Sequence, residues 1–318
     1  MLDILAITAP VFLMIAIGYT SVAWGLFDAA AMRILGTYVV YLALPALLFK
    51  ALSERPVTEI INPAYMLAYL GGSLVVLAAG FYFARRIRRA DTTTAAFSAM
   101  GMVCSNSGFI GYPILLLTLP SIAGVALALN MMVENIVLIP LLLAIAEAGR
   151  DGPTSAGRMI AGVLRGLSRN PIIIGLVAGL VASLTGLALP APLMKPIDML
   201  AASSAAVSLL VIGGTLAGVP LRGLSGEIAP IVAGKLLAHP LAVFAATAVL
   251  PFAGLAPLSR ELQAAAVILA AVPMMGIYPI LAQRFGRERT SVVAMLVATV
   301  LSFFTLSFVL WAVNRYIL

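Results

Sequence analysis

Charged residues are scarce in this chain, and so are cysteine and histidine. Only 10% of the 318 residues are charged while 63% are hydrophobic, and the mean hydropathy is +1.13. A soluble domain carries about a quarter charged residues, so the composition excludes a water-soluble globular protein. The single cysteine, Cys104, cannot form an intrachain disulfide. With one histidine beside it, the chain has few residues for a metal cage or a cysteine–histidine nucleophile.

Motifs of several protein classes are also absent. The sequence has no H-E-x-x-H motif, no pair of aspartates in the middle of an apolar segment and no G-x-x-x-x-G-K-[ST] loop. We therefore expect no enzyme activity, no metal and no cofactor, and an ATP-driven pump would need a separate ATPase subunit. The net charge of +7 comes from 19 basic and 12 acidic residues. Loops that orient membrane helices explain this excess better than nucleic-acid binding does.

Ten apolar segments are long enough to cross a membrane, which takes about 20 residues each. Of the 19 basic residues, 13 lie in one set of alternate connections, five in the other, and Lys235 inside a segment. This asymmetry predicts a multi-pass protein of the inner (plasma) membrane with both termini outside. No basic region precedes the first segment, so we expect a retained span and not a signal peptide. The predicted spans are 3–24, 30–52, 64–86, 92–118, 121–147, 171–190, 197–218, 228–250, 261–283 and 290–314.

The spans divide into two halves of five, residues 1–148 and 171–318, joined by a polar linker at 149–170. Because each half has an odd number of spans, the second enters the membrane from the opposite side, as in an inverted repeat. The fourth span of each half carries a similar stretch. Residues 111–115 read Gly-Tyr-Pro-Ile-Leu, and residues 277–281 read Ile-Tyr-Pro-Ile-Leu.

The fourth and ninth spans contain glycine and proline inside their apolar runs. Glycine favours non-helical backbone and proline removes a helix hydrogen bond, and lipid cannot satisfy the polar groups that are freed. Paired breaks in two halves indicate a binding site near the membrane midplane, and a pair of ordinary kinked helices is the alternative. The predicted crossover or hinge residues are Gly111, Pro113, Pro273, Gly276 and Pro279.

Helix-capping residues stand just before the predicted restart of the fourth span. A helix that restarts inside the membrane directs free N–H groups and a positive dipole end into the cavity. Serine and asparagine cap such an end, or share its donors with a bound carboxylate. We therefore predict an anionic substrate, although sodium held by open carbonyls and serine hydroxyls is an alternative. The predicted binding residues here are Ser105, Asn106, Ser107 and Gly108.

Two further spans carry polar or ionisable residues at helical spacing. Glu134 lies near the middle of the fifth span, where a functional role is the default. Asn130 shares its face, so Asn130 and Glu134 are candidates for contact with substrate, and Asn135 follows Glu134 in the sequence. Lys235 and His239 share a face of the eighth span and, with Glu134, are candidates for proton coupling. The alternatives are packing roles for Glu134 and His239 and a snorkelling Lys235.

Several short motifs lie in a fixed order along the whole chain. They are residues 44–49, 106–113, 133–135, 170–171, 235–240 and 278–279. Together they resemble the auxin efflux carrier family, most closely its compact bacterial branch of malate or malonate permeases. The resemblance implies a ten-helix, five-plus-five inverted fold in which spans 4 and 9 cross at their breaks. Spans 1, 2, 6 and 7 are then the scaffold, and spans 3–5 and 8–10 an elevator-type transport domain.

The same resemblance assigns roles to individual residues. It makes Asn106 the asparagine that contacts the substrate carboxylate and Pro113 and Pro279 the crossover prolines, with Glu134 or Asn135 as a further substrate contact. Residues 107–110 read Ser-Gly-Phe-Ile and depart from the plant pattern, which argues against an indole-sized substrate.

The sequence therefore predicts a secondary active transporter of small organic anions such as malate, malonate or auxin-like acids. Protons or the membrane potential would drive it, with alternating access at the crossover of spans 4 and 9. The alternatives are a sodium-coupled symporter of the bile-acid-transporter type and a passive anion channel. We expect membrane lipids but no nucleic acid as partners, and a homodimer is one possible assembly.

Overall fold

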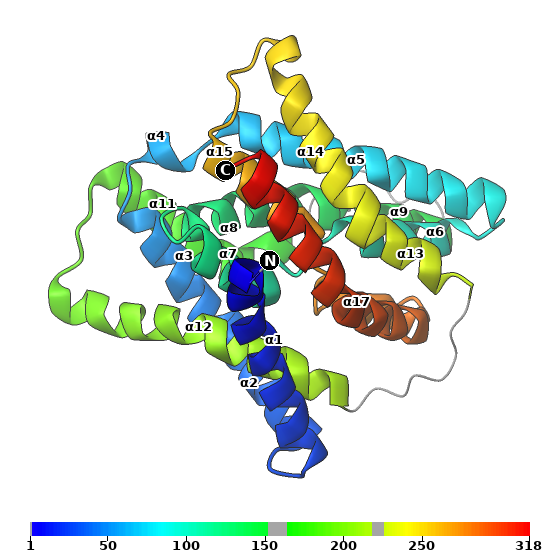
Figure 1. The fold of residues 1–318 in the computed structure, drawn as a ribbon, viewed down its shortest axis with the longest axis horizontal. Helices are drawn as coiled ribbons and strands as arrows, with labels where there is room; N and C mark the ends of the chain where they lie inside the picture. Colours follow the sequence, from blue (N-terminus) through cyan, green and yellow to red (C-terminus); the bar gives the residue numbers. More distant parts are fainter. Residues whose placement is uncertain (1, 152–163, 218–225) are drawn as a thin grey trace. The chain divides into compact units, whose positions relative to one another are not determined.

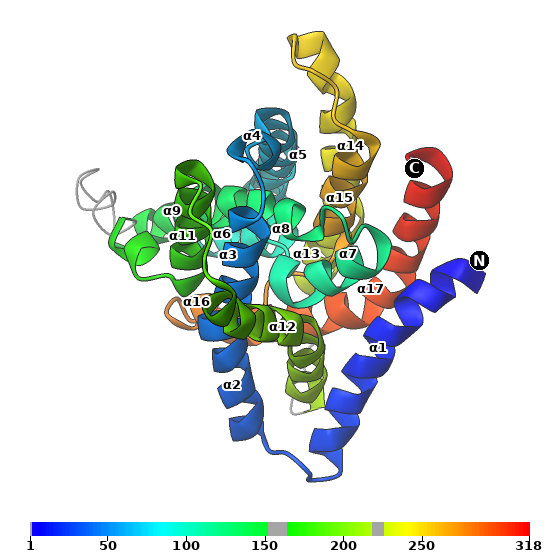
Figure 2. The ribbon, with the colours of Figure 1, turned by 90° about the vertical axis from the view of Figure 1, so that its left-hand side faces the viewer.

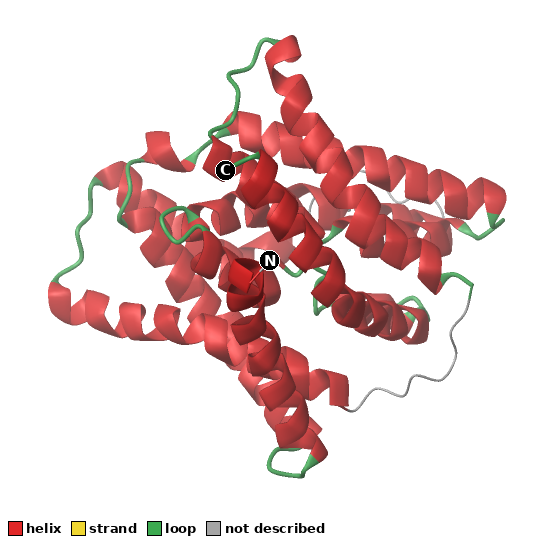
Figure 3. Cartoon of the chain, viewed as in Figure 1, coloured by secondary structure: helices red, strands yellow, loops and turns green. Residues whose placement is uncertain are grey.

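The computed structural model describes residues 2–151, 164–217 and 226–318, and these residues form helices without any β-strand (Figure 3). Six of the helices are long and apolar enough to cross a membrane, and three shorter ones are also apolar. The expected all-helical class is therefore confirmed for the described residues, and the six long apolar helices are consistent with a membrane protein. The six are Ala29–Ser53, Val57–Ile87, Ala123–Arg150, Ala191–Ala217, Ile228–Phe252 and Glu288–Tyr316; the shorter ones are Ala9–Ala23, Ser107–Thr118 and Pro171–Thr185.

The chain forms two compact units. The first comprises Met1–Pro63, Ser107–Leu129 and Leu167–Gly218, and the second comprises Ala64–Asn106, Asn130–Gly166 and Val219–Leu318. The helix α8 (Ala123–Met132) runs from the first into the second.

In the first unit, α1 packs along α12 and α3 packs along α11 (Figures 1 and 2). Glycine allows the first of these close approaches, since a methyl group on Gly213 would lie 1.8 Å from the carbonyl oxygen of Ile15. The elements of this unit are α1 (Leu2–Ala23), α2 (Ala29–Tyr38), η1 (Val39–Ala43), α3 (Leu44–Ser53), α4 (Val57–Ile60), η3 (Ser107–Gly111), α7 (Tyr112–Thr118), α11 (Pro171–Thr185) and α12 (Ala191–Ala217).

In the second unit, α6 packs against α9, α14 against α15, and α16 against α17. An ion pair between Arg287 and Glu227 (2.6 Å) joins the start of α17 to the start of α13. The elements are α5 (Pro63–Tyr82), η2 (Phe83–Ile87), α6 (Thr92–Val103), η4 (Val133–Leu138), α9 (Ile139–Asp151), α13 (Ile228–Ala233), η5 (Gly234–Ala238), α14 (His239–Val249), η6 (Leu250–Ala253), α15 (Arg260–Ala271), α16 (Tyr278–Gln283) and α17 (Glu288–Tyr316).

The described residues contain five wide, π-helical turns, and four of them end two residues before a proline. The turns η1, η3, η4 and η5 precede Pro45, Pro113, Pro140 and Pro240 respectively. Proline cannot donate to the preceding turn and its ring collides with the carbonyl four residues back. Widening that turn relieves the collision without ending the helix. The following proline therefore accounts for these four turns, whereas η2 ends α5 without one.

The helix bounds follow the ten predicted apolar segments, and the largest difference is six residues, where α12 begins at Ala191 instead of 197. Most of the predicted linker at 149–170 lies outside the described residues, because 152–163 are not described, and neither is Arg222 of the orientation count. The division into inverted halves and the orientation of the termini stay predictions.

Gly72 lets α5 pack closely against α14, and we expect its replacement to destabilise the protein. A methyl group at Gly72 would lie 2.7 Å from the backbone nitrogen and Cα of Val243, whereas one at Gly71 would meet no atom within 4 Å. Overpacking costs about 1–3 kcal/mol, while alanine is otherwise a better helix former than glycine. Thermal unfolding in detergent should show a lower Tm for Gly72→Ala and no loss for Gly71→Ala. Equal Tm values for both variants would contradict this packing.

Candidate functional site

Two helices of the second unit stop inside the protein and continue as extended backbone. The helix α6 ends at Val103, and Cys104 then has φ −88° and ψ 116°. The helix α15 ends at Ala271, and Val272 has φ −67° and ψ 153°. The breaks therefore fall in the predicted fourth and ninth spans.

The three prolines of these spans take different positions. Pro279 occupies the first turn of α16, where proline needs no backbone donor. Pro113 lies inside the helix Ser107–Thr118, after the wide turn η3, and Pro273 lies in the extended segment itself. In the fourth span, the extended residues 104–106 precede Gly111 and Pro113.

The two extended segments pair with each other. Ser105 and Met274 form an antiparallel β-bridge. This pairing satisfies backbone groups that the interrupted helices leave free, as an apolar surrounding requires. Asn106 N–H donates to the Pro273 carbonyl (2.8 Å), and Met275 N–H donates to the Cys104 carbonyl (3.2 Å).

Glu134 hydrogen-bonds to the bridge through the Ser105 backbone. Its side chain is 2% exposed, and Oε1 accepts hydrogen bonds from the backbone N–H of Ser105 (2.9 Å) and the hydroxyl of Tyr69 (3.0 Å). Asn130, one turn earlier on the same helix, is also buried. The helix face that the spacing predicted Asn130 and Glu134 to share is therefore buried, and their contact with substrate stays a prediction.

Lys235, in η5, hydrogen-bonds to the same bridge through the Ser105 side chain. Its side chain is fully buried, and Nζ donates to Ser105 Oγ (2.5 Å), His239 Nδ1 (2.8 Å) and the carbonyl of Ala270 (2.9 Å). The snorkelling interpretation of Lys235 is therefore wrong, because the ammonium has acceptors inside the protein. His239 Nε2 in turn contacts Ser73 Oγ (2.9 Å).

The remaining predicted residues divide between the two units. Asn106 is buried at the break, whereas Asn135 is half-buried and its side-chain amide donates to the Met131 carbonyl of its own helix (3.0 Å). Gly276 lies in the turn before α16. Four others belong to the first unit, where η3 packs against α12 and α7 against α1. These buried residues are Ser107, Gly108, Gly111 and Pro113.

Three residues of the site were not predicted, and all lie on one face of α5. Tyr65 stacks on Tyr69, with ring centroids 6.2 Å apart, and Tyr69 meets the His239 ring edge-on at 5.5 Å. Tyr65, Tyr69 and Ser73 are spaced four residues apart, a helical stripe of polar atoms within an apolar segment. This four-residue spacing of polar side chains is the sequence pattern from which these residues could have been predicted.

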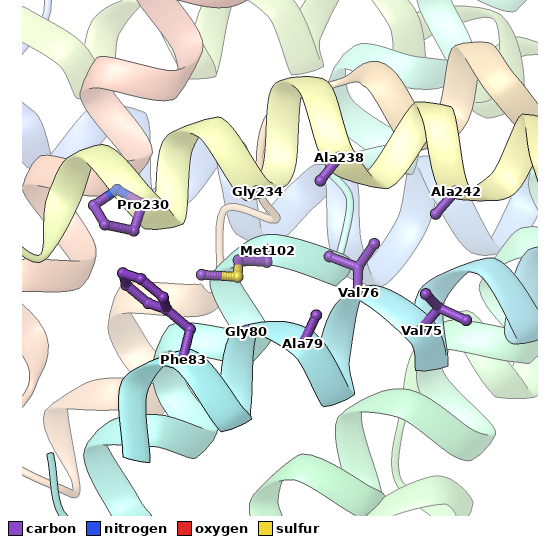
Figure 4. Close-up of a pocket in the computed structure, with 10 residues that line it drawn as sticks. All are labelled: Val75, Val76, Ala79, Gly80, Phe83, Met102, Pro230, Gly234, Ala238 and Ala242. Atoms are coloured by element: carbon purple, nitrogen blue, oxygen red, sulfur yellow. The ribbon is translucent and has the colours of Figure 1, made fainter. Parts of the chain in front are cut away.

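A separate hollow of about 480 Å³ lies between α5 and the helix formed by α13, η5 and α14 (Figure 4). Figure 4 shows Met102 between Gly80 and Gly234, the two glycines that make room for its thioether. All ten lining residues are apolar, so this hollow offers no side chain for a carboxylate. The polar site at the helix breaks is distinct from it.

Membrane-length helices with paired internal breaks and buried ionisable residues are features of an integral membrane transporter. The family described as "Membrane transport protein" matches residues 3–310, and the chain belongs to this family. The resemblance to auxin efflux carriers is thereby confirmed. The chain is also similar to a protein of Rhizobium meliloti (strain 1021) described as "Putative malonate transporter". The two are 31% identical over 319 residues, which cover 99% of this chain and 97% of the relative.

We expect Lys235→Met to lower the Tm of the protein in detergent. The change leaves three buried acceptors short of a donor, and each unsatisfied group costs about 1–3 kcal/mol. Lys195→Met, at an exposed position of α12, is the matched control and should leave the Tm unchanged. If the two variants melt at the same temperature, the contacts of Lys235 do not stabilise the fold.

Proposed function

We propose that this protein is a secondary transporter of small organic anions and that it binds them at the bridged helix breaks. The single observation that carries the proposal is the pairing of Ser105 with Met274 between a buried acid and a buried base. Interrupted helices and buried ionisable groups destabilise a membrane protein, and they are therefore retained mainly where function requires them. Transporters use such breaks to bind solutes near the midplane.

Asn106 is the residue we assign to the substrate carboxylate. It is 4% exposed and immediately follows the bridge, and its backbone N–H is already bonded to Pro273. We assign its side-chain carboxamide to the substrate because Lys235, the other candidate, directs all three ammonium protons to protein acceptors. The "Putative malonate transporter" relative supports a small dicarboxylate, and malonate is our first choice.

Protons are the driving ion that the site supports best. The Cys104 and Pro273 carbonyls each accept a backbone N–H group, and Ser105 Oγ accepts a lysine ammonium proton, so a sodium ion bound to these oxygens would compete with the existing donors. A cation at this position would also face the positive charge of Lys235. Glu134, buried and directly bonded to the bridge, is the proposed proton acceptor.

The two compact units support an elevator-type movement. The first unit contains α1, α2, α3, α11 and α12, which correspond to the predicted scaffold spans, and in addition residues 107–129. The bridge, Glu134 and Lys235 all belong to the second unit. A second unit that moves as one body would carry the intact site across the membrane. In this proposal the protein spans the inner membrane as two inverted halves of five helices, with both termini outside.

We expect Asn106→Ala to reduce malonate uptake by about tenfold or more, since a hydrogen bond to a charged group contributes about 1.5–3 kcal/mol. Uptake of labelled malonate into proteoliposomes measures this, with an unchanged Tm as evidence of folding. Asn314→Ala, an exposed asparagine of α17, is the control and should transport normally. Near-normal uptake by Asn106→Ala would contradict the assignment of Asn106 to substrate binding.

Glu134→Gln should abolish malonate accumulation driven by a pH gradient while leaving malonate counterflow, because glutamine keeps the shape but cannot carry the proton. A sodium gradient should not drive the wild-type protein. Glu288→Gln, exposed at the start of α17, should accumulate malonate normally. Unchanged pH dependence in Glu134→Gln would contradict proton coupling through this residue, and flux that only equilibrates in the wild type would favour a channel.

A further inference from the structure

We propose that Tyr69 and Ser105 form a proton relay that connects Lys235 to Glu134. Four groups follow one another at hydrogen-bond distance: Lys235 Nζ to Ser105 Oγ (2.5 Å), Ser105 Oγ to Tyr69 Oη (3.0 Å) and Tyr69 Oη to Glu134 Oε1 (3.0 Å). This inference rests on the proposed function and assigns a role to Tyr69, which the sequence did not reveal.

When Lys235 is an ammonium and Glu134 a carboxylate, every hydrogen bond of the relay is donated in the direction from Lys235 to Glu134. An ammonium has only donors and a carboxylate only acceptors. Lys235 therefore donates to Ser105, and Tyr69 donates to Glu134. The Tyr69 hydroxyl proton is then in use, so Ser105 must donate to the Tyr69 oxygen.

The reversed arrangement satisfies the same atoms. Lys235 passes a proton to Ser105 Oγ, the Ser105 hydroxyl proton moves to Tyr69, and the Tyr69 proton moves to Glu134. One N–H bond breaks at Lys235 and one O–H bond forms at Glu134, leaving a neutral amine and a neutral carboxylic acid. The amine keeps two protons for His239 Nδ1 and the Ala270 carbonyl and accepts from Ser105. Both arrangements are therefore complete, which lets the proton move between them.

The neighbours of the relay complete this arrangement. His239 accepts from Lys235 through Nδ1 and donates through Nε2 to Ser73, so it is a neutral imidazole in both states. The other titratable groups facing the acid and the base are Tyr65 from α5 and Cys104 from the break, both buried. From α15, the contact with Lys235 is the Ala270 carbonyl, which does not titrate. The relay thus converts two buried charges into neutral groups without admitting water.

Temperature-jump infrared spectroscopy on the purified protein in detergent tests the relay without any transport measurement. The jump shifts the balance between the charged and neutral arrangements, and the carbonyl band of protonated Glu134, assigned by its loss in Glu134→Gln, reports the relaxation. We expect this relaxation in the wild type and its absence in Lys235→Met. Tyr69→Phe should slow it by about tenfold or more, because one proton carrier is lost.

Tyr278→Phe is the matched control, since Tyr278 is also buried in the second unit but its hydroxyl donates to the Phe97 carbonyl and not to the relay. It should relax like the wild type. Ser105→Ala should be as slow as Tyr69→Phe, and Ser105→Thr, which restores the hydroxyl, should relax normally. Wild-type rates in Tyr69→Phe and Ser105→Ala, or no relaxing Glu134 band in the wild type, would overturn the relay.

Malonate flux, measured after the same purified proteins are reconstituted into proteoliposomes, separates this inference from the proposed function. Normal flux by the wild type without a relaxing Glu134 band leaves a transporter and refutes the relay. The expected infrared relaxation without flux of any organic acid supports the relay and refutes the substrate class.

Discussion

The structure depends on one requirement: a backbone interrupted inside an apolar helix must find hydrogen-bond partners within the protein. The two breaks of the second unit supply these partners to each other through the β-bridge between Ser105 and Met274. The bridge then determines which side chains the neighbouring helices must supply. Ser105 presents its N–H to Glu134 and its hydroxyl to Lys235. An acid and a base are both stable in the interior because one residue of the break lies between them.

The prolines explain how the helices deliver these two side chains. Glu134 lies in η4 and Lys235 in η5, the wide turns that precede Pro140 and Pro240. A π-helical turn shifts the side chains before it relative to those after it, and such turns are frequent at functional sites. In this protein the same local feature thus serves two purposes, since it accommodates proline within a long helix and aims an ionisable residue at the break.

Composition and spacing predicted much of the fold, because apolar length and helical periodicity are local properties. They also placed Asn130 with Glu134, and Lys235 with His239, on shared helix faces. The contacts across the breaks could not be predicted, because they join residues such as Ser105 and Lys235 that are 130 positions apart. Tyr69 was missed for a related reason: tyrosine in an apolar segment is consistent with simple packing, and only its partners reveal its hydroxyl as a link. The glycines and prolines indicated the broken spans, but not that the extended backbone of the fourth precedes Pro113.

The hydrogen bonds of Lys235 limit which residue of the proposed site can bind the substrate. A free buried ammonium would be the obvious partner for an anionic substrate, yet its three protons already have acceptors in Ser105, His239 and Ala270. In the proposed function, substrate recognition falls to a neutral group, Asn106, at the end of the same extended segment. The acid and the base are left for the proton. Because Ser105 would belong both to the proposed relay and to the bridge, a change in their protonation would alter the hydrogen bonds of the residue next to Asn106. In this proposal, coupling between proton and substrate needs no longer path than one peptide bond.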